Sequence, residues 1–437
     1  MKLAVVVQRY GADIGGGAEL HARYIAERLS RHAEVEVFTT CARDYVTWRN
    51  ERPEGIERVN GLAVHRFPVR RERDPRDFGR WSERVFNHTH SMADELAWLE
   101  SEGPASPALV SALSASADRF DFFLFFSFRY YHAYWGVRAV TPKAVLVPTA
   151  ERDPAVGLGL FVPLLRGVRA FMYNSFEERD LLQSASGTRD VPGVVVGIGS
   201  EIPAAPDPDR FRHKHGIRGR FAIYIGRIDE NKGCKELFAH FGKYASATPG
   251  GLSLVLIGQS ILPIPDHPRI RHLGFLPDED KFDAIAAADV LIAPSPFESL
   301  SMVALEAWAL GRPVLVNGAC DVLKGQCLRS HAGLYYDNAA EFAEALHWLA
   351  NIPSLATSLG ASGRSYYQRH YRWPVIERKY LDTFDRLSRE PGDQVARRSG
   401  LAPLPGWFAR RRWEMRPASH VLLDLPKGPS LAGRDDS

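Results

Sequence analysis

Apolar positions near the start of the chain follow a strand, helix, strand pattern. An apolar run at 3–7 leads into a glycine-rich loop, and 18–29 then shows apolar residues three and four apart, the spacing of one helical face. A second apolar run follows at 35–39. Strand, helix and strand joined by short connections predict a parallel sheet of the doubly wound type.

The rest of the N-terminal half is less regular but carries further apolar runs. Helices are expected at about 90–100, 107–117 and 176–183, and strands at 122–126, 145–148 and 170–174. The segment 66–86 is charged and rich in arginine, and no element is assigned to it. We expect all of these segments to belong to one α/β unit.

The alternation restarts after a stretch rich in glycine and proline at 192–208. Strands are expected at 221–225, 252–257, 290–293 and 314–316, and helices at 235–244, 278–287, 300–310 and 341–349. We therefore predict two α/β domains, 1–195 and 200–372. A last helix at 374–390 can pack on either domain, and 391–437, rich in Pro, Gly, Arg and Ser, is expected to be poorly ordered.

Composition narrows the class of protein. The chain has 437 residues, 45% of them hydrophobic, and a net charge of only +3, so it is expected to be a soluble globular protein and not a nucleic-acid binder. The four cysteines form no CxxC pair, which fits a reducing compartment. No long apolar window predicts a membrane span. We expect a cytoplasmic protein, with the basic and aromatic segment 407–413 allowing peripheral attachment to a membrane.

The strongest candidate site is the segment 294–306, which leaves a predicted strand and enters a predicted helix. Free amides at Ser299–Ser301 would lie at the start of the helix, an arrangement that binds anions. Glu298 precedes the helix and Glu306 lies about two turns inside it. A diphosphate between two carboxylates that accept from hydroxyls is a nucleotide sugar. The alternative is an ordinary capped helix, with Glu298 solvated and Glu306 paired to an arginine.

Two further loops follow predicted strands. In 224–233 a strand ends at Gly226, and Arg227 and Lys232 lie beyond it, where ligands of open parallel sheets bind. Two cations there suit a diphosphate, although a basic loop can also be merely solvated. The third loop is Gly15–Gly17, whose backbone is able to approach a phosphate or a sugar closely. It matches neither GxGxxG nor a P-loop, so it is weak evidence for NAD or ATP, and it can be a simple turn.

The order of these motifs resembles a known family. The segment 221–336 resembles the donor domain of family 4 retaining glycosyltransferases, which have the GT-B fold. The resemblance rests on Gly226-Arg227-Ile228-Asp229, Lys232-Gly233, Gly274-Phe275-Leu276, Ala288-Asp289-Val290, Pro294-Ser295, Glu298 and Glu306 with seven residues between them, Ala307, and Gly311-Arg312-Pro313-Val314. It implies an α/β protein with two Rossmann-like domains whose parallel sheets face each other across a cleft.

The resemblance also implies roles for individual residues. Arg227 and Lys232 would neutralise the donor diphosphate and stabilise the leaving nucleoside diphosphate. Glu306 would accept from the ribose hydroxyls and Glu298 from hydroxyls of the transferred sugar. The backbone amides of Ser299, Leu300 and Ser301 would add hydrogen bonds to phosphate or sugar. Gly226 would end the strand beside the bound donor. No metal and no cofactor is expected, because fixed cations and a helix dipole perform that task.

The acceptor side resembles the family less closely. Gly16 and Gly17 would close over the diphosphate from the N-terminal domain. Family members often carry a histidine after the strand that corresponds to 145–148, and this chain has Glu151-Arg152-Asp153 there. Either Glu151 or Asp153 would then replace the histidine and assist deprotonation of the acceptor, or the site is altered in this chain. Tyrosines and a tryptophan at 130–135 would stack on a sugar or pack in the core.

The function expected from the resemblance is transfer of a hexose, with retention, from a nucleotide-diphosphate sugar to a glycan or lipid-linked acceptor, in synthesis of a cell-surface polysaccharide. Two other functions fit the same residues. One is a non-hydrolysing sugar-nucleotide epimerase, which would release no free nucleoside diphosphate when an acceptor is present. The other is a non-catalytic protein that binds a sugar nucleotide or a glycan. A dehydrogenase is disfavoured because no GxGxxG follows any predicted strand.

Overall fold

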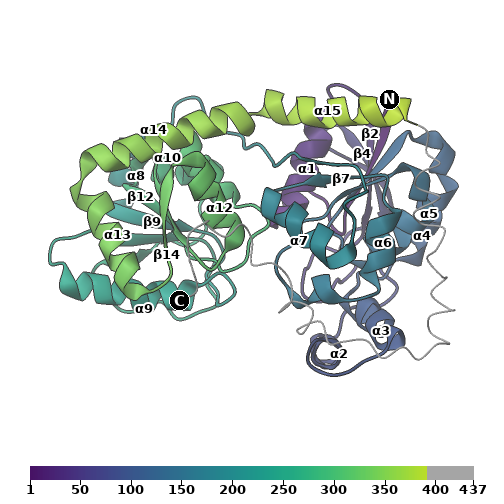
Figure 1. The fold of residues 1–437 in the computed structure, drawn as a ribbon, viewed down its shortest axis with the longest axis horizontal. Helices are drawn as coiled ribbons and strands as arrows, with labels where there is room; N and C mark the ends of the chain where they lie inside the picture. The colour runs from purple at the N-terminus through teal and green to yellow at the C-terminus, as the bar shows by residue number, and fades with distance from the viewer. Residues whose placement is uncertain (391–437) are drawn as a thin grey trace. The chain divides into compact units, whose positions relative to one another are not determined.

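The computed structural model describes residues 1–390 and divides into two compact units. Among the described residues, the first unit contains Met1–Gly197 and 377–390, and the second contains Ile198–Ile376. The ribbon shows that each unit has its own sheet with helices packed against it (Figure 1). The segment 391–437, expected to be poorly ordered, lies outside the described residues.

The first unit is built on an eight-stranded sheet in the order β3-β4-β2-β1-β5-β6-β7-β8. Its strands are β1 (Lys2–Val6), β2 (Glu34–Thr40), β3 (Gly55–Val59), β4 (Leu62–Phe67), β5 (Phe122–Phe126), β6 (Ala144–Val147), β7 (Ala170–Tyr173) and β8 (Gly193–Val195). All neighbours are parallel except β3 and β4. That hairpin corrects the expectation of a wholly parallel sheet, and it lies at the sheet edge, where an antiparallel strand is common.

Helices cover both faces of this sheet, and every residue of its central strand β5 is therefore buried. They are α1 (Gly17–Leu29), α2 (Pro75–Asn87), α3 (Met92–Glu102), α4 (Pro107–Ala115), α5 (Tyr131–Ala139), α6 (Phe161–Gly167) and α7 (Phe176–Ser186). Helix α2 occupies part of the charged segment to which no element was assigned. Asp74 caps it by accepting from the amides of Arg76 and Asp77.

The second unit is built on a six-stranded parallel sheet in the order β11-β10-β9-β12-β13-β14. Its strands are β9 (Phe221–Ile225), β10 (Ser253–Ile257), β11 (Ile270–His272), β12 (Val290–Ala293), β13 (Val314–Asn317) and β14 (Gly333–Tyr336). Its helices are α8 (Pro208–His215), α9 (Cys234–Ala247), α10 (Asp278–Ala287), α11 (Met302–Ala309), α12 (Asp321–Ser330), α13 (Ala339–Asn351) and α14 (Pro353–His370). Neither α12 nor α14 was expected from the sequence.

Helix α14 forms where its sequence argues against a helix. Gly360 and Gly363 lower helix propensity, but both let the helix approach its neighbours. A Cβ on Gly360 would lie 2.0 Å from the carbonyl oxygen of Gly311, and one on Gly363 would lie 2.4 Å from the Trp308 ring. The close packing of α14 against α11 therefore outweighs the propensity cost of the two glycines.

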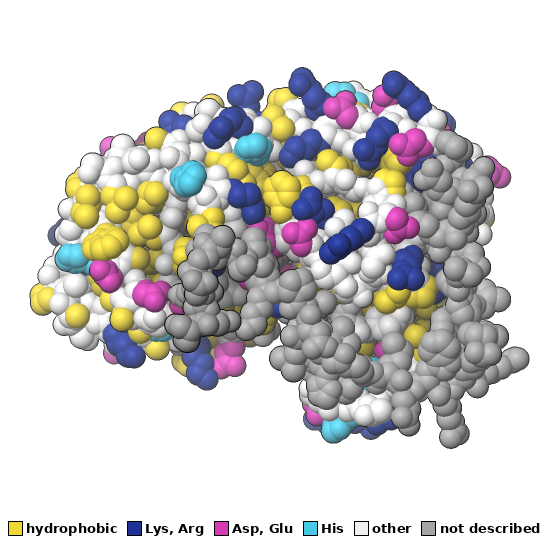
Figure 2. All heavy atoms as spheres, viewed as in Figure 1, with side chains coloured by type: hydrophobic (Ala, Val, Ile, Leu, Met, Phe, Trp, Pro, Cys, Tyr) yellow, Lys and Arg dark blue, Asp and Glu magenta, His cyan; other side chains and the backbone are white. Residues whose placement is uncertain are grey.

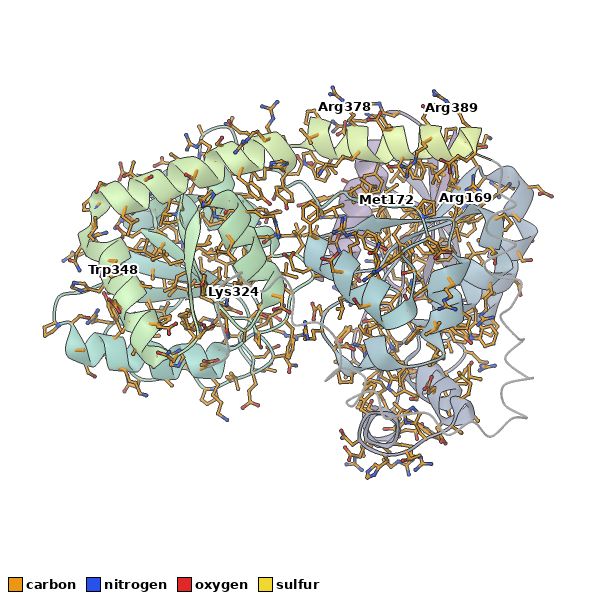
Figure 3. The ribbon with its side chains drawn as sticks, viewed as in Figure 1. Arg169, Met172, Lys324, Trp348, Arg378 and Arg389 are labelled. Atoms are coloured by element: carbon orange, nitrogen blue, oxygen red, sulfur yellow. The ribbon has the colours of Figure 1, made fainter. Side chains whose placement is uncertain are left out.

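Helix α15 (Trp373–Arg389) connects the two units through the chain, and from Glu377 onwards it belongs to the first. Glu377 accepts from Arg28 of α1, and Phe384 stacks on Phe122 of β5 with ring centres 5.2 Å apart. Arg169, just before β7, donates to the carbonyl of Leu387 at 2.8 Å. The exposed arginines of α15 project away from the sheet, as Figure 3 shows for Arg378 and Arg389, and Figure 2 shows basic side chains gathered along this helix.

Candidate functional site

The loops predicted to form the donor site follow two neighbouring strands of the second sheet. Strands β9 and β12 pair directly, although β10 and β11 lie between them in the sequence. The order of strands therefore reverses between β9 and β12. In open parallel sheets, ligands bind beyond the carboxyl ends of the strands at such a reversal.

Arg227 and Lys232 come from the loop after β9. Asp229, which is buried, holds this loop together: it pairs with the Arg227 guanidinium and accepts from the Lys232 amide at 2.8 Å. The Tyr224 hydroxyl donates to the Arg227 carbonyl at 2.7 Å. The Arg227 side chain remains 52% exposed. The loop is thus fixed at its base while the guanidinium stays accessible to an anion.

Lys232 meets Glu298 from the loop after β12. The Lys232 ammonium donates to the carboxylate at 2.8 Å, and the two side chains are 33% and 17% exposed. This contact joins the two predicted loops at the point where the strand order reverses. Glu298 is therefore paired with a cation, which corrects the alternative in which it is merely solvated.

Gly233 allows the two loops to lie this close. Its φ is 72°, in the left-handed region, and a Cβ there would lie 2.2 Å from the carbonyl oxygen of Pro294. Only glycine fits both the backbone conformation and the contact. Gly226, at the end of β9, also has a positive φ and donates its amide to Ile257 at 3.0 Å.

Helix α11 begins later than the sequence predicted, at Met302, with Ser301 as its N-cap. The Ser301 side chain makes no capping hydrogen bond, so the amides of the first turn keep their hydrogen-bonding capacity. Ser299 is half-buried and Leu300 buried. The backbone at 299–301 therefore leads into an uncapped helix start, which is suited to an anion.

Glu306 lies just over one turn inside α11, not two, and only 2% of it is exposed. One carboxylate oxygen accepts from the Ser200 hydroxyl at 2.7 Å and from the Lys281 ammonium at 3.1 Å. The other oxygen is buried and has no hydrogen-bond partner among the described residues. Glu306 is thus paired with a lysine, where the alternative expected an arginine, and its contacts do not include Lys232 or Glu298.

The Lys281–Glu306 pair is electrostatically coupled. Burial acts to lower the pKa of Lys281, but the charges of Glu306 and Asp278 outweigh it and hold the pKa above its ordinary value. Lys281 is therefore charged at neutral pH. Such a buried pair needs both members, because removing one leaves an uncompensated charge.

The glycines of the first unit lie in the loop after β1. Gly15, Gly16 and Gly17 are all exposed, and Gly16 is the N-cap of α1 with φ 152°. A Cβ on Gly16 would lie 2.3 Å from a carboxylate oxygen of Glu19. Glu19 is itself held by Arg9 at 2.6 Å in a buried ion pair. The turn therefore requires glycine at position 16, and its backbone remains open to a ligand.

Glu151 is half-buried in the loop after β6 and is engaged by other groups of the protein. Its neighbour Asp153 pairs with Arg129 from the loop after β5 and accepts from the Ala155 amide at 2.6 Å. Burial acts to lower the pKa of Arg129, but Asp153 and Glu102 raise it above its ordinary value. The aromatic residues after β5 mostly pack in the core: Tyr130, Tyr131 and Tyr134 are buried.

Glu178 on α7 was missed by the sequence reasoning. Its carboxyl group accepts from the Ala150 amide at 2.6 Å and from the Asn174 amide, so it holds the chain just before Glu151. Burial raises its pKa to about 8, against the hydrogen bonds that lower it. The only sequence signal was Ser175 three residues earlier, which caps α7 by accepting from the Glu178 amide.

Residues 1–390, which the structure describes, contain neither a candidate membrane-spanning helix nor a cluster of metal-binding side chains. No helix there is both long and apolar enough to span a bilayer. No group of three or more His, Cys, Asp and Glu side chains in that part of the chain is arranged to hold a metal ion. The segment 407–413, which the sequence reasoning connected with a membrane surface, lies outside the described residues.

A comparison with protein families matches residues 219–351 to the family described as Glycosyl transferases group 1. The matched range runs from the start of β9 to the end of α13 and contains Arg227, Lys232, Glu298 and Glu306. This matched segment of the chain belongs to the family. The second unit is the part that carries the family's sequence pattern.

The curated relatives of the chain are distant. The chain is 27% identical over 252 residues to D-inositol 3-phosphate glycosyltransferase of Corynebacterium aurimucosum, covering 51% of this chain and 58% of that protein. It is 25% identical over 143 residues to mannosylfructose-phosphate synthase of Agrobacterium fabrum, covering 26% and 32%. The alignments thus span from about a third to just over half of these relatives' length.

Solved structures establish that the chain has the GT-B fold. Sucrose-phosphate synthase from Thermosynechococcus elongatus superposes with a TM-score of 0.66 at 17% identity, covering 89% of this chain and 99% of that one. HepE of Anabaena, in complex with UDP-glucose, gives 0.65 at 16% identity, covering 88% and 100%. The expectation of two α/β domains of the GT-B type is therefore confirmed at the level of the fold.

Proposed function

We propose that the protein is a retaining glycosyltransferase that moves a hexose from a nucleotide-diphosphate sugar to a glycan or lipid-linked acceptor. The observation that carries this proposal is the contact between Lys232 and Glu298, 2.8 Å apart, at the reversal of strand order in the second sheet. The solved complex of HepE with UDP-glucose adds support for a donor of this class.

The residues act mainly on the donor. Arg227 and Lys232 neutralise the diphosphate, and the uncapped start of α11 adds backbone amides of Ser299, Leu300 and Ser301. These interactions strengthen as negative charge moves onto the departing nucleoside diphosphate, so they lower the barrier for breaking the glycosidic bond. Glu298 accepts from hydroxyls of the transferred sugar, and the second oxygen of Glu306 accepts from the ribose.

The acceptor hydroxyl attacks the anomeric carbon from the face that the nucleotide leaves, which retains the configuration. The hydroxyl proton passes to the leaving diphosphate or to Glu151, which stands where relatives often place a histidine. We place this reaction in the cytoplasm, in the synthesis of a cell-surface polysaccharide.

The proposal is tested by the release of nucleoside diphosphate from UDP-, GDP-, ADP- and TDP-sugars. We expect one base to give slow release alone and faster release with a sugar acceptor, and the NMR coupling of the product's anomeric proton to match that of the donor. A product of inverted configuration would refute retention. A donor that binds without any release would favour the non-catalytic binding protein, and conversion of the donor to its epimer would favour the epimerase.

A further inference from the structure

The carboxyl edge of the first sheet carries a charge cluster that the proposed donor chemistry does not use. Arg9 follows β1, Arg129 follows β5 and Asp153 follows β6, and these three strands are neighbours in the sheet. The order of strands reverses between β1 and β5, just as it does at the donor loops of the second sheet. This edge is therefore a place where a parallel sheet binds its ligand.

Two residues at this edge have an unusual backbone. Ser127, directly after β5, has φ 66°, and Thr149, after β6, has φ 49°. Their hydroxyls lie 2.7 Å apart and hydrogen bond to each other. Left-handed conformations of residues other than glycine cost free energy and tend to gather at functional sites. The two strand ends are thus held in a fixed arrangement that local sequence preference does not favour.

Every arginine of the cluster is matched by a carboxylate. We define the balanced cluster as Arg9 with Glu19, Arg73 with Glu102, and Arg129 with Asp153. Glu102 joins the last two pairs, since it lies 3.0 Å from Arg129 as well as 2.8 Å from Arg73. The formal charge of the six side chains is zero.

Tyr45 joins Arg9 to the rest of the balanced cluster. Its ring is 44% exposed, and the guanidinium carbons of Arg9 and Arg73 lie 5.5 Å and 5.7 Å from the ring centre. The balanced cluster therefore combines an accessible aromatic residue with guanidinium groups that are already neutralised. Those of Arg9 and Arg73 are buried, and the Arg129 side chain is 27% exposed. Arg152, in the loop after β6, is engaged by other groups as well.

The family resemblance already assigns the acceptor to the first unit. We propose that the acceptor group placed at this edge is an uncharged, hydroxyl-rich sugar and not a phosphorylated one. The inference rests on the proposed function. A phosphate brought to the balanced cluster would meet as many carboxylates as guanidinium groups and would gain little net attraction. A neutral sugar loses nothing by this balance, because charged groups also donate to and accept from hydroxyls.

Asp153→Asn is the decisive variant. Asparagine keeps a side-chain oxygen that can accept from the Ala155 amide, so the turn after it remains capped. It removes one negative charge and leaves Arg129, whose side chain is 27% exposed, with Glu102 as its remaining acid. The uncompensated positive charge should then favour a phosphorylated acceptor.

The assay measures nucleoside diphosphate release from UDP-glucose, or from the donor that the panel identifies, with matched acceptors: glucose and glucose 6-phosphate, mannose and mannose 6-phosphate. We expect the neutral sugars to stimulate release by the wild-type protein more than their phosphates do. In Asp153→Asn the ratio of kcat/KM for phosphorylated over neutral sugar should rise about tenfold, a partial gain because the site is half open to water. Asp180→Asn, an exposed acid on α7 paired with Arg179, is the matched control and should leave the ratio unchanged.

Three results would overturn the inference. They are a wild-type preference for the phosphorylated sugars, a wild-type protein that turns over its donor but is stimulated by none of the neutral sugars, and a folded Asp153→Asn protein with an unchanged ratio. Thermal unfolding of both variants establishes that they are folded. If no donor of the panel is turned over at all, the proposed function fails first and the inference falls with it. A donor that is turned over with the wrong acceptor preference refutes the inference alone.

Discussion

Replacing Lys232 by alanine separates catalysis from folding, because the ammonium contributes very differently to each. In the folded protein the ammonium pairs with Glu298 at 2.8 Å, and a third of the Lys232 side chain is exposed. Pairs that are open to water contribute about 0–1 kcal/mol to stability, since solvent screens the charges and the side chains lose entropy. The substitution should therefore lower the free energy of unfolding by less than about 1 kcal/mol.

The effect on turnover should be far larger. If the Lys232 ammonium donates to the departing diphosphate, its interaction grows as negative charge develops there. Loss of one such positioned donor typically lowers turnover by about 100- to 1,000-fold, which corresponds to about 3–4 kcal/mol of barrier. The barrier should thus rise by at least three times as much as the stability falls.

The assay compares initial rates of nucleoside diphosphate release at saturating donor with urea unfolding of the same preparations. Lys235→Ala is the matched control: this exposed lysine lies three residues away on α9 and pairs with Glu230 at 3.0 Å. We expect it to change neither quantity measurably. A Lys232→Ala protein that keeps turnover within threefold of the wild type would refute the assigned role, as would a loss of rate that merely follows a loss of stability.

Two further predictions concern stability, measured by urea unfolding. Gly233→Ala should lower the free energy of unfolding by at least about 1–2 kcal/mol, because alanine disfavours φ 72° and its Cβ would meet Pro294. Gly242 lies inside α9 with open space around it, so Gly242→Ala should raise that free energy by about 0.5–1 kcal/mol. Glu178 has a pKa raised by burial from 4.5 to about 8, so its stabilising contribution is complete below pH 4.5 and is lost as the pH rises through 8. Glu178→Gln should therefore flatten the fall in unfolding free energy between pH 5 and pH 8, and an unchanged slope would contradict the assignment.

The sequence placed two loops correctly, because each follows directly after a strand. The loops that contain Lys232 and Glu298 were predicted because each comes after a short apolar run and before an amphipathic segment, and the structure joins them at 2.8 Å. Sequence reasoning failed where structure depends on distant partners. Helix α14 forms around glycines that pack against α11, and the strands β3 and β4 lie in a polar segment at a sheet edge.

The balanced cluster was out of reach for a related reason. Arg73, Glu102, Arg129 and Asp153 come from segments far apart in the sequence, and no local spacing pairs them. Glu178 was missed because a carboxyl group in the capped first turn of a helix is ordinarily solvated. Here the group is buried and accepts hydrogen bonds from backbone amides of two loops. In each case tertiary packing, and not a local motif, determines what the side chain contacts.

Glu306 shows how one residue can serve folding and binding together. Its first carboxylate oxygen is occupied by Ser200 and Lys281, which is the arrangement of a structural ion pair. A buried carboxylate with an unpartnered oxygen is costly, and packing alone gives no reason for it. The second oxygen of Glu306 is in that position among the described residues. A ribose hydroxyl that donates to this oxygen would satisfy it. The pair with Lys281 uses the other oxygen, so it orients the carboxylate for the ligand instead of competing with it.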